Sequence, residues 1–338
     1  MSDVREIKLT DIKGIRVGHA QNEAGGTGCT AIICDNGATA GVDVRGGGPA
    51  SRETELLRPE KLVQQIHCVM LSGGSAYGLE AGDGAMQYLE EKGIGFDVGI
   101  GIVPIVCGAS CFDLVVGDPK YRPDKAMGYA ACQASETGEE PAMGNAGAGT
   151  GATVGKFLGL DYMVKTGLGI HAVQVGEVQC AALVVVNALG DVIDYDTGKT
   201  IAGLLNEEKT GFRSTVEVMY KEIGKDRSVY HDEVPGGEET SGPVTNTTLG
   251  VIITNAKLDK AQCSKLAQIA HNGYARTIEP VHTSADGDTI FVLATGETDV
   301  APDCLGALAT EVMGRAVNKA ARSAAPAYGL PAACSFAE

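Results

Sequence analysis

Short apolar runs typical of β-strands alternate along this chain with segments of helical spacing, and this alternation strongly limits the folds available to it. The pattern predicts helices at residues 76–91, 259–274 and 303–322, with a shorter helix at 51–57 capped by Ser51. It predicts strands at residues 30–34, 40–44, 66–71, 181–187, 249–254 and 289–295. No repeat or clear linker divides the chain. We therefore expect one layered α/β domain over residues 1–338, with helices covering the sheet faces.

Three further stretches carry turn or loop signals. Asp35-Asn36-Gly37 is expected to be a turn between two strands. Pro104 makes residues 102–106 an edge or irregular strand. Residues 117–152 are rich in loop residues, and residues 221–245 lack any apolar period and are predicted to be the least ordered part of the chain.

Composition and charge exclude several classes of protein. The formal net charge of −16 argues against binding to nucleic acid and favours a neutral or cationic small partner. The chain has no apolar run long enough for a membrane span, and its first residues lack the apolar core of a secretory signal. Its ten cysteines lie mostly in apolar runs, which indicates reduced core residues of a cytoplasmic protein.

Common site motifs are absent or incomplete. The glycine run at 144–151 does not complete a phosphate-binding loop, and no apolar strand leads into it as a dinucleotide site would require. Ser75 lies in a segment that resembles a nucleophile elbow, but Tyr77 occupies a position where that motif has glycine. Cysteines and histidines do not have metal-ligand spacing. No metal and no organic cofactor is therefore expected.

The segment Asn246-Thr247-Thr248 opens a strand directly after the poorly patterned loop, and it suggests a different chemistry. If the Asn246–Thr247 peptide bond is broken, Thr247 gains an α-amine with an unperturbed pKa of roughly 7.7–8.0. That amine can accept the proton of the neighbouring hydroxyl, so one residue supplies both nucleophile and base. The cut itself can use the same hydroxyl, attacking the carbonyl of Asn246. The simpler alternative is that threonine tolerates a strand end and asparagine a turn.

Two aspartates, Asp286 and Asp288, precede the strand predicted at 289–295. Their spacing of two places both on one side if the strand extends back to them. Two close carboxylates could orient the hydroxyl and hold the ammonium form, with one of them taking up a proton. The alternative interpretation is a solvated Asp-Gly turn.

Several motifs together resemble one family. They are VRGGGPASRETELL (44–57), LSGGSAYGLEAGDGAMQYLEEKGIGF (71–96), VPIVCGASCFDL (103–114), GNAGAGTGATVGK (144–156) and VVVNALG (184–190). In this order they resemble the self-processing N-terminal-nucleophile amidohydrolases, which include the DmpA-type β-peptidyl aminopeptidases and the nylon-oligomer endohydrolases. The similarity covers about residues 12–328.

This resemblance implies a four-layer αββα sandwich formed by two self-cleaved pieces, residues 1–246 and 247–338, and a homo-oligomer (a tetramer) of such pairs. Thr247 matches the nucleophile. Asn187 matches the family's oxyanion-stabilising asparagine, and Lys156 matches an active-site lysine of the nylon-type members. Asn246-Thr247 with Asp286 and Asp288 is similar to the nylon-hydrolase branch, whereas the aminopeptidase members carry Gly-Ser and a Ser/Glu pair there. Tyr77 and Asn145 are expected to line the substrate pocket.

The sequence thus favours an amide hydrolase acting on short amide oligomers or small peptides through an acyl-enzyme. Three alternatives stay open. The chain could be an aminopeptidase that releases β-amino or D-amino residues, or an acyltransferase that resembles the ornithine acetyltransferases, which use a similar self-cut threonine. It could also be a binding protein that never cleaves itself.

Overall fold

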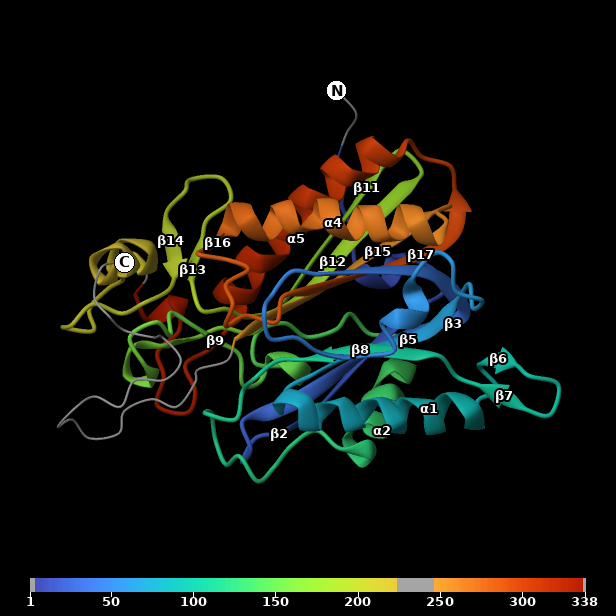
Figure 1. The fold of residues 1–338 in the computed structure, drawn as a ribbon, viewed down its shortest axis with the longest axis horizontal. Coiled ribbons are helices and arrows are strands. Elements are labelled where there is room, and N and C mark those ends of the chain that lie inside the picture. The colour runs from blue at the N-terminus through green and yellow to red at the C-terminus, as the bar shows by residue number, and fades with distance from the viewer. Residues whose placement is uncertain (1–3, 224–245, 337–338) are drawn as a thin grey trace.

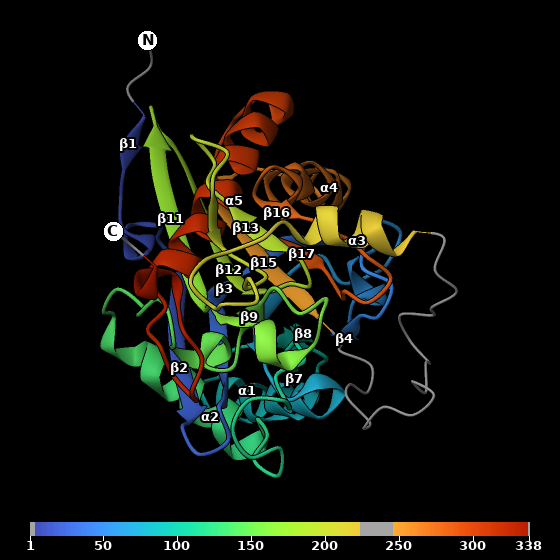
Figure 2. The same cartoon turned by 90° about the vertical axis from the view of Figure 1, so that its left-hand side faces the viewer.

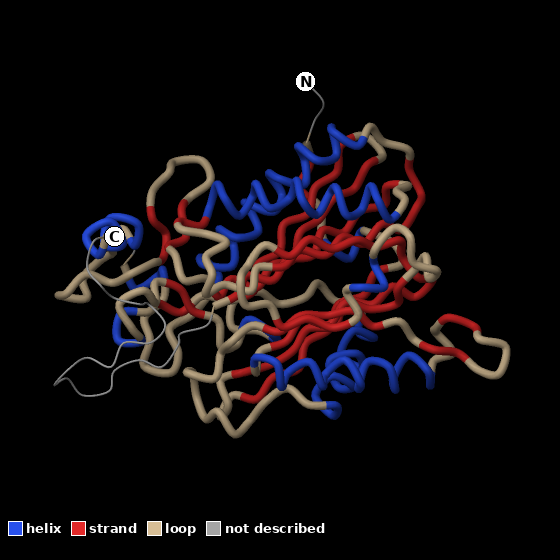
Figure 3. The backbone as a smooth tube through the Cα atoms, viewed as in Figure 1, coloured by secondary structure: helices blue, strands red, loops and turns tan. Residues whose placement is uncertain are grey.

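The computed structural model describes residues 4–223 and 246–336 (Figure 1). Two β-sheets lie face to face, and helices cover the outer face of each (Figures 1 and 3). This is the αββα arrangement that the sequence predicted.

The first sheet carries the segments that were predicted as strands in the second half of the chain. Neighbouring strands are antiparallel except for β15 and β17, which run parallel. In spatial order the sheet contains β1 (Arg5–Glu6), β11 (Leu168–Val175), β12 (Val178–Asn187), β15 (Thr247–Ala256), β17 (Thr289–Thr298) and the second half of β3 (Thr27–Val44).

Strand β3 belongs to both sheets. Its first half pairs with β2 (Ile15–Asn22) and with β5 (Ile66–Ser72), and its second half pairs with β17. The sequence predicted two strands separated by a turn at 35–37. The structure has one strand, and there the β3–β5 register shifts between Ile33 and Ala38 and Gly37 takes a φ of +74°. The turn residues thus bend the strand from one sheet into the other. The second sheet continues from β5 to β8 (Val106–Ser110) and β4 (Ala50–Arg52).

Four longer helices form the outer layers. Helices α4 (Lys260–Thr277) and α5 (Pro302–Ser323) cover the first sheet, and α1 (Ala81–Glu91) and α2 (Lys125–Ala134) cover the second (Figures 1 and 2). A capping box begins α4: Asp259 accepts from the Gln262 N–H at 2.7 Å, and the Gln262 side chain accepts from the Asp259 N–H at 2.9 Å. Pro302 begins α5. The N–H of a first helical residue has no partner within the helix, so the absence of this N–H in proline costs no helical hydrogen bond.

Smaller elements connect these layers. Among the described residues, the one further α-helix is α3 (Thr215–Glu222). The short strands are β6 (Phe96–Asp97) with β7 (Ile102–Val103), β9 (Thr153–Val154) with β10 (Val164–Lys165), and β13 (Asp191–Ile193) with β14 (Thr200–Ala202) and β16 (Ile278–Glu279). Single 3₁₀ turns occur at Leu9–Asp11, Glu55–Leu57, Ser135–Thr137, Gly147–Gly149, Leu160–Tyr162 and Ala333–Ser335, and a longer 3₁₀ segment at Ser75–Glu80 leads into α1.

Three apolar cores lie between the layers. The core that a strand side chain joins shows to which side of the sheet that side chain points. Along β15, Leu249, Val251 and Ile253 pack in the core shared by the two sheets, whereas Ile252 packs against α4 and α5. In β17, Phe291 and Leu293 join the core between the sheets, and Ile290 and Val292 the core under the helices. Alternate residues therefore face the second sheet and the helix layer.

Eight of the ten cysteines are buried, and Cys304 and Cys334 are exposed, all as free thiols. Cys34, Cys68 and Cys180 are among the buried ones, as the sequence predicted. Burial raises the pKa of the Cys180 thiol to about 12, so this group stays protonated at neutral pH.

Besides the turn at 35–37, one local prediction was wrong, one was incomplete, and one falls largely outside the described residues. The helix predicted at 51–57 is absent, because Ser51 and Arg52 pair with β8 as part of β4 and only residues 55–57 form a 3₁₀ turn. The stretch 117–152, predicted to be rich in loop, also contains α2, which Asp124 caps by accepting from the Met127 N–H at 2.8 Å. The predicted least-ordered segment, 221–245, lies outside the described residues from residue 224 onward.

Candidate active site

Thr247 begins β15 at the end of the sheet where β12 ends and β17 begins, and it is buried. It lies directly opposite Asn187 in the antiparallel β12–β15 pair. By the alternation of both strands, the two side chains share the face that is turned toward the second sheet. The hydroxyl and the amide are thus neighbours on the inner side of the sandwich.

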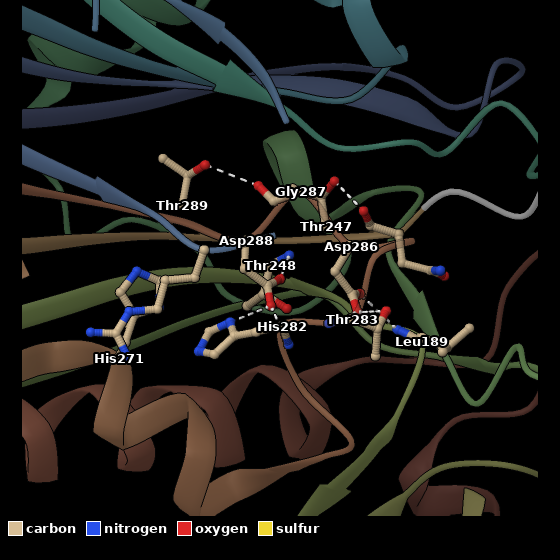
Figure 4. Close-up of polar contacts among 12 residues, drawn as sticks. Leu189, Thr247, Thr248, His271, His282, Thr283, Asp286, Gly287, Asp288 and Thr289 are labelled. Carbon is tan, nitrogen blue, oxygen red and sulfur yellow. Dashed lines mark hydrogen bonds and ion pairs between the residues drawn. The ribbon is translucent and has the colours of Figure 1, made fainter. Parts of the chain in front are cut away.

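The carbonyl oxygen of Asn246 accepts two hydrogen bonds. One comes from the Thr247 hydroxyl, and the other comes from the Gly287 N–H at 2.9 Å (Figure 4). The Thr247 oxygen therefore lies beside the peptide bond that the sequence analysis predicted to be cut. Gly287 must be a glycine here, because a Cβ at this position would lie 2.7 Å from Thr247 Oγ1.

Lys156 and Asn187 form a buried polar cluster next to the nucleophile position. Lys156 Nζ donates to Asn187 Oδ1 at 2.8 Å and to the Asn187 backbone oxygen at 3.1 Å, and Thr153 N–H donates to the same Oδ1 at 3.0 Å. These donors identify Oδ1 as the oxygen of the amide. Asn187 Nδ2 donates to the Phe112 carbonyl at 2.8 Å, which uses one of its two hydrogens. The second hydrogen is the one that could serve an oxyanion.

Burial changes the protonation of Lys156. It lowers the pKa of the ammonium to about 7, although the negative charge of Asp286 opposes this shift. A useful fraction of Lys156 is therefore a neutral amine near neutral pH, and such an amine can take up a proton.

Asp286 and Asp288 share one face of their segment, as their spacing predicted, and it is the face opposite to Thr247. Asp286 accepts from the Leu189 N–H at 3.2 Å and from the Thr283 N–H at 3.1 Å, while Asp288 accepts from the Thr248 N–H at 2.7 Å (Figure 4). Both carboxylates are buried, so the prediction of a solvated Asp-Gly turn was wrong.

Neither carboxylate contacts the Thr247 hydroxyl directly in the described part of the chain. Among the residues that the structure describes, neither accepts a hydrogen bond from Thr247 Oγ1. Burial, and then the charge of Asp288, raise the pKa of Asp286 to about 6. Asp286 thus connects the segment before β17 to the residues that follow β12, and Asp288 connects it to β15.

The glycine-rich loop at residues 45–48 packs against the backbone of the segment that carries Asp286 and Asp288. Gly48 N–H donates to the Asp286 carbonyl at 2.8 Å, and Arg45 N–H donates to the Asp288 carbonyl at 2.9 Å. A Cβ at Gly46 would lie 2.3 Å from the Asp286 oxygen, so only glycine permits this approach. The sequence analysis used this loop as part of the family resemblance without predicting its place beside Asp286.

The sequence analysis also missed other residues of this region. Asp113 and Lys165 are buried near Lys156, and burial raises the pKa of Asp113 to about 6 and lowers that of Lys165 to about 7. Lys165 Nζ donates to the Gly149 and Ala152 carbonyls at 3.0 and 3.1 Å, which points to a structural role. His282, four residues before Asp286, bonds to Asp288. A lone histidine gives no spacing signal that could have identified it.

The two predicted pocket residues lie in exposed or partly exposed positions. Tyr77 is 61% exposed, and the Arg122 guanidinium stacks 3.9 Å from its ring centroid. Asn145 Nδ2 donates to the Ala325 carbonyl at 2.9 Å, near the end of α5. Neither has a hydrogen bond to Thr247 or Asn187 within the described ranges. Their place in a substrate pocket stays a prediction.

The sequence profile of Peptidase family S58 matches residues 8–330. The chain belongs to this family. Within the curated relatives, an uncharacterized aminopeptidase of Mycobacterium leprae is 37% identical, with 97% of this chain and 93% of that protein covered. A 6-aminohexanoate-oligomer endohydrolase of Agromyces sp. is 33% identical, with 94% of this chain and 87% of that protein covered. This S58 chain is therefore a hydrolase.

The fold agrees with this family assignment. The L-aminopeptidase D-Ala-esterase/amidase of Ochrobactrum anthropi, described as a variant of the Ntn hydrolase fold, superposes with a TM-score of 0.65 at 18% identity. That comparison covers 94% of this S58 chain and 86% of the other. Within residues 4–223 and 246–336, no group of three or more His, Cys, Asp or Glu side chains could hold a metal ion, and no helix has the length and apolarity for a membrane crossing.

Proposed function

We propose that this S58 hydrolase cleaves itself between Asn246 and Thr247 and then hydrolyses short amides with Thr247 as nucleophile. One observation carries the proposal: the Thr247 hydroxyl bonds to the carbonyl oxygen of its own preceding peptide bond, which also accepts the Gly287 N–H. A hydroxyl in this position is ready to attack that carbonyl, and the N–H is in place to stabilise the negative charge that forms on the oxygen.

In the self-cleavage step, Thr247 Oγ1 attacks the Asn246 carbonyl carbon and releases its proton to a nearby base. We assign this role to the neutral amine of Lys156, which bonds to Asn187, the residue opposite Thr247 in the β12–β15 pair. The C–N bond then breaks, and the leaving nitrogen takes up a proton to become the Thr247 α-amine. Water hydrolyses the resulting ester, which leaves a carboxylate on Asn246 and frees the hydroxyl.

In turnover, the new α-amine replaces Lys156 as the proton acceptor for the Thr247 hydroxyl. The hydroxyl adds to the substrate amide, and the free hydrogen of Asn187 Nδ2 stabilises the oxyanion. The protonated amine gives its proton to the leaving nitrogen, and water hydrolyses the acyl-enzyme. In this scheme Asp286 and Asp288 orient the two strands beside the nucleophile.

The names of the relatives support two classes of substrate for this chain. The 33% identical relative is named for 6-aminohexanoate oligomers, and the 37% identical one is named an aminopeptidase. The Asn-Thr junction with two aspartates favours short amide oligomers as substrates, and the aminopeptidase is the second candidate. Paired assays on N-blocked and free-amine substrates separate the two, because an aminopeptidase needs the free amine. We also propose a cytoplasmic location and an oligomer of cleaved pairs. Size-exclusion chromatography of the purified protein tests the oligomer.

A denaturing gel and intact-mass analysis test self-cleavage. We expect bands of about 25 and about 9.5 kDa, dividing 34.8 kDa by the lengths of the pieces, with threonine at the new N-terminus. The Thr247→Ala variant should give one band and no hydrolysis, and Thr247→Ser is the matched control that keeps a hydroxyl. Hydrolysis by the alanine variant would contradict the proposal.

A further inference from the structure

We propose that His282 is a positioning residue that holds Asp288 in place behind the nucleophile. The inference rests on the proposed function, since it assigns a role in the reaction of Thr247. His282 makes two hydrogen bonds to one oxygen of Asp288: Nδ1 lies 2.8 Å from Oδ2, and the backbone N–H lies 3.1 Å from the same atom. The other oxygen, Oδ1, accepts from Thr248 N–H at 2.7 Å. Asp288 thus connects His282 to the residue that follows Thr247.

The backbone of His282 supports a role beyond packing. Its φ is +57°, in the left-handed region that costs free energy for any residue with a Cβ. Asn or Gly would adopt this conformation more readily. The conformation aims both donors of His282 at the same carboxylate oxygen, which an extended backbone would not do.

The His282 ring is held from the helix side. The ring of His271, on α4, packs edge-on at 4.7 Å between centroids, and His271 Nε2 lies 3.2 Å from the Asp43 carbonyl of β3 (Figure 4). Because the Asp288 carboxylate only accepts, Nδ1 of His282 is the donor in this contact. Among the described residues, the buried Nε2 has no hydrogen-bond partner, so Nδ1 carries the ring's polar contact.

The arrangement predicts which property of the enzyme His282 controls. Asp288 meets Thr248 through a backbone N–H and does not line the face where Thr247 and Asn187 lie. Loss of the His282 bond would let Asp288 turn and the start of β15 shift. Such a change slows the chemical steps, self-cleavage and kcat, and leaves KM nearly unchanged, because the substrate does not touch His282.

Three variants of one position separate the hydrogen bond from the backbone. His282→Asn keeps a donor at the place of Nδ1 and tolerates the positive φ. His282→Gln carries the same amide one carbon further out, where it does not match Nδ1. His282→Gly removes the side-chain donor and also removes the strain of the positive φ. The rate of self-cleavage, kcat, KM and the melting temperature are measured for each, together with Thr247→Ala.

We expect His282→Gln and His282→Gly to lower the self-cleavage rate and kcat by about tenfold or more, with KM within about twofold, and His282→Asn to restore most of the rate. In an Asp288→Asn background, His282→Gly should have little further effect. Wild-type rates in His282→Gly or His282→Gln, or an equal loss in all three variants, would overturn the inference. If His282→Gly does not fold, the comparison of His282→Gln with His282→Asn still decides. Hydrolysis by Thr247→Ala would instead refute the proposed function.

Discussion

Asn187 and Thr247 face each other across the β12–β15 pair, at the end of a sheet whose inner face packs into the apolar core between the sheets. Lys156 and Thr153 hold the oxygen of the Asn187 amide, so its nitrogen has a fixed direction. A preorganised donor beside a hydroxyl is the arrangement that acyl transfer requires, because it needs little reorganisation when charge develops.

Replacing Asn187 by Asp should lower kcat by about 100-fold to 1,000-fold, the usual cost of losing one oxyanion donor. Aspartate keeps the shape and the acceptor for Lys156 but has no N–H. Steady-state kinetics on a short amide measure the effect, with the wild type and Asn187→Ala compared at the same pH. Full activity in the aspartate variant would exclude Asn187 as the oxyanion donor.

Replacing Gly287 by Ala should slow both self-cleavage and turnover by about 100-fold or more. The new Cβ would lie 2.7 Å from Thr247 Oγ1 and 2.8 Å from the Gly48 carbonyl, so the hydroxyl must move. Gly101→Ala is the matched control, since a Cβ there meets no heavy atom within 4 Å and the position has no positive φ. If both variants process at the wild-type rate, the close approach at Gly287 has no catalytic consequence.

The rate of self-cleavage should depend on pH through Lys156. Its pKa is lowered to about 7, so below that value it is an ammonium that cannot accept the Thr247 proton, and above it a neutral amine. We expect the rate to rise about tenfold per pH unit below 7 and to level off above about 8. Timed gels of freshly purified precursor measure it. Lys156→Met should process slowly and without this rise; an unchanged profile in that variant would assign the titration to another group.

Thiol labelling should separate the cysteines into two classes. In the folded protein we expect rapid reaction at Cys304 and Cys334 only, because the other eight are buried and burial raises the pKa of thiols such as Cys107, to about 12. All ten should react after unfolding. Peptide mapping by mass spectrometry identifies the labelled positions. Rapid labelling of Cys180 in the native protein would contradict the packing of β12.

The local pattern of the sequence was sufficient for the main elements of the fold. Apolar runs of strand length predicted β5, β12, β15 and β17, and helical spacing predicted α4 and α5, because these signals depend on neighbours along the chain. The same local reasoning failed at Ser51 and Arg52. Their pairing with β8 is a long-range contact that overrides a weak helical preference.

For the site, the sequence by itself determined the chemical types and the order of the residues: a threonine after an asparagine at a strand start, an aspartate pair, a buried-strand asparagine and a lysine. Only the tertiary structure decided their geometry. It placed Asn187 and Thr247 on the inner face of the sheet and Asp286 and Asp288 on the outer face. It also brought Gly287 next to Thr247, and His282 next to Asp288. Strand pairing and alternation fix these relations between distant segments, and no local pattern in one chain encodes them.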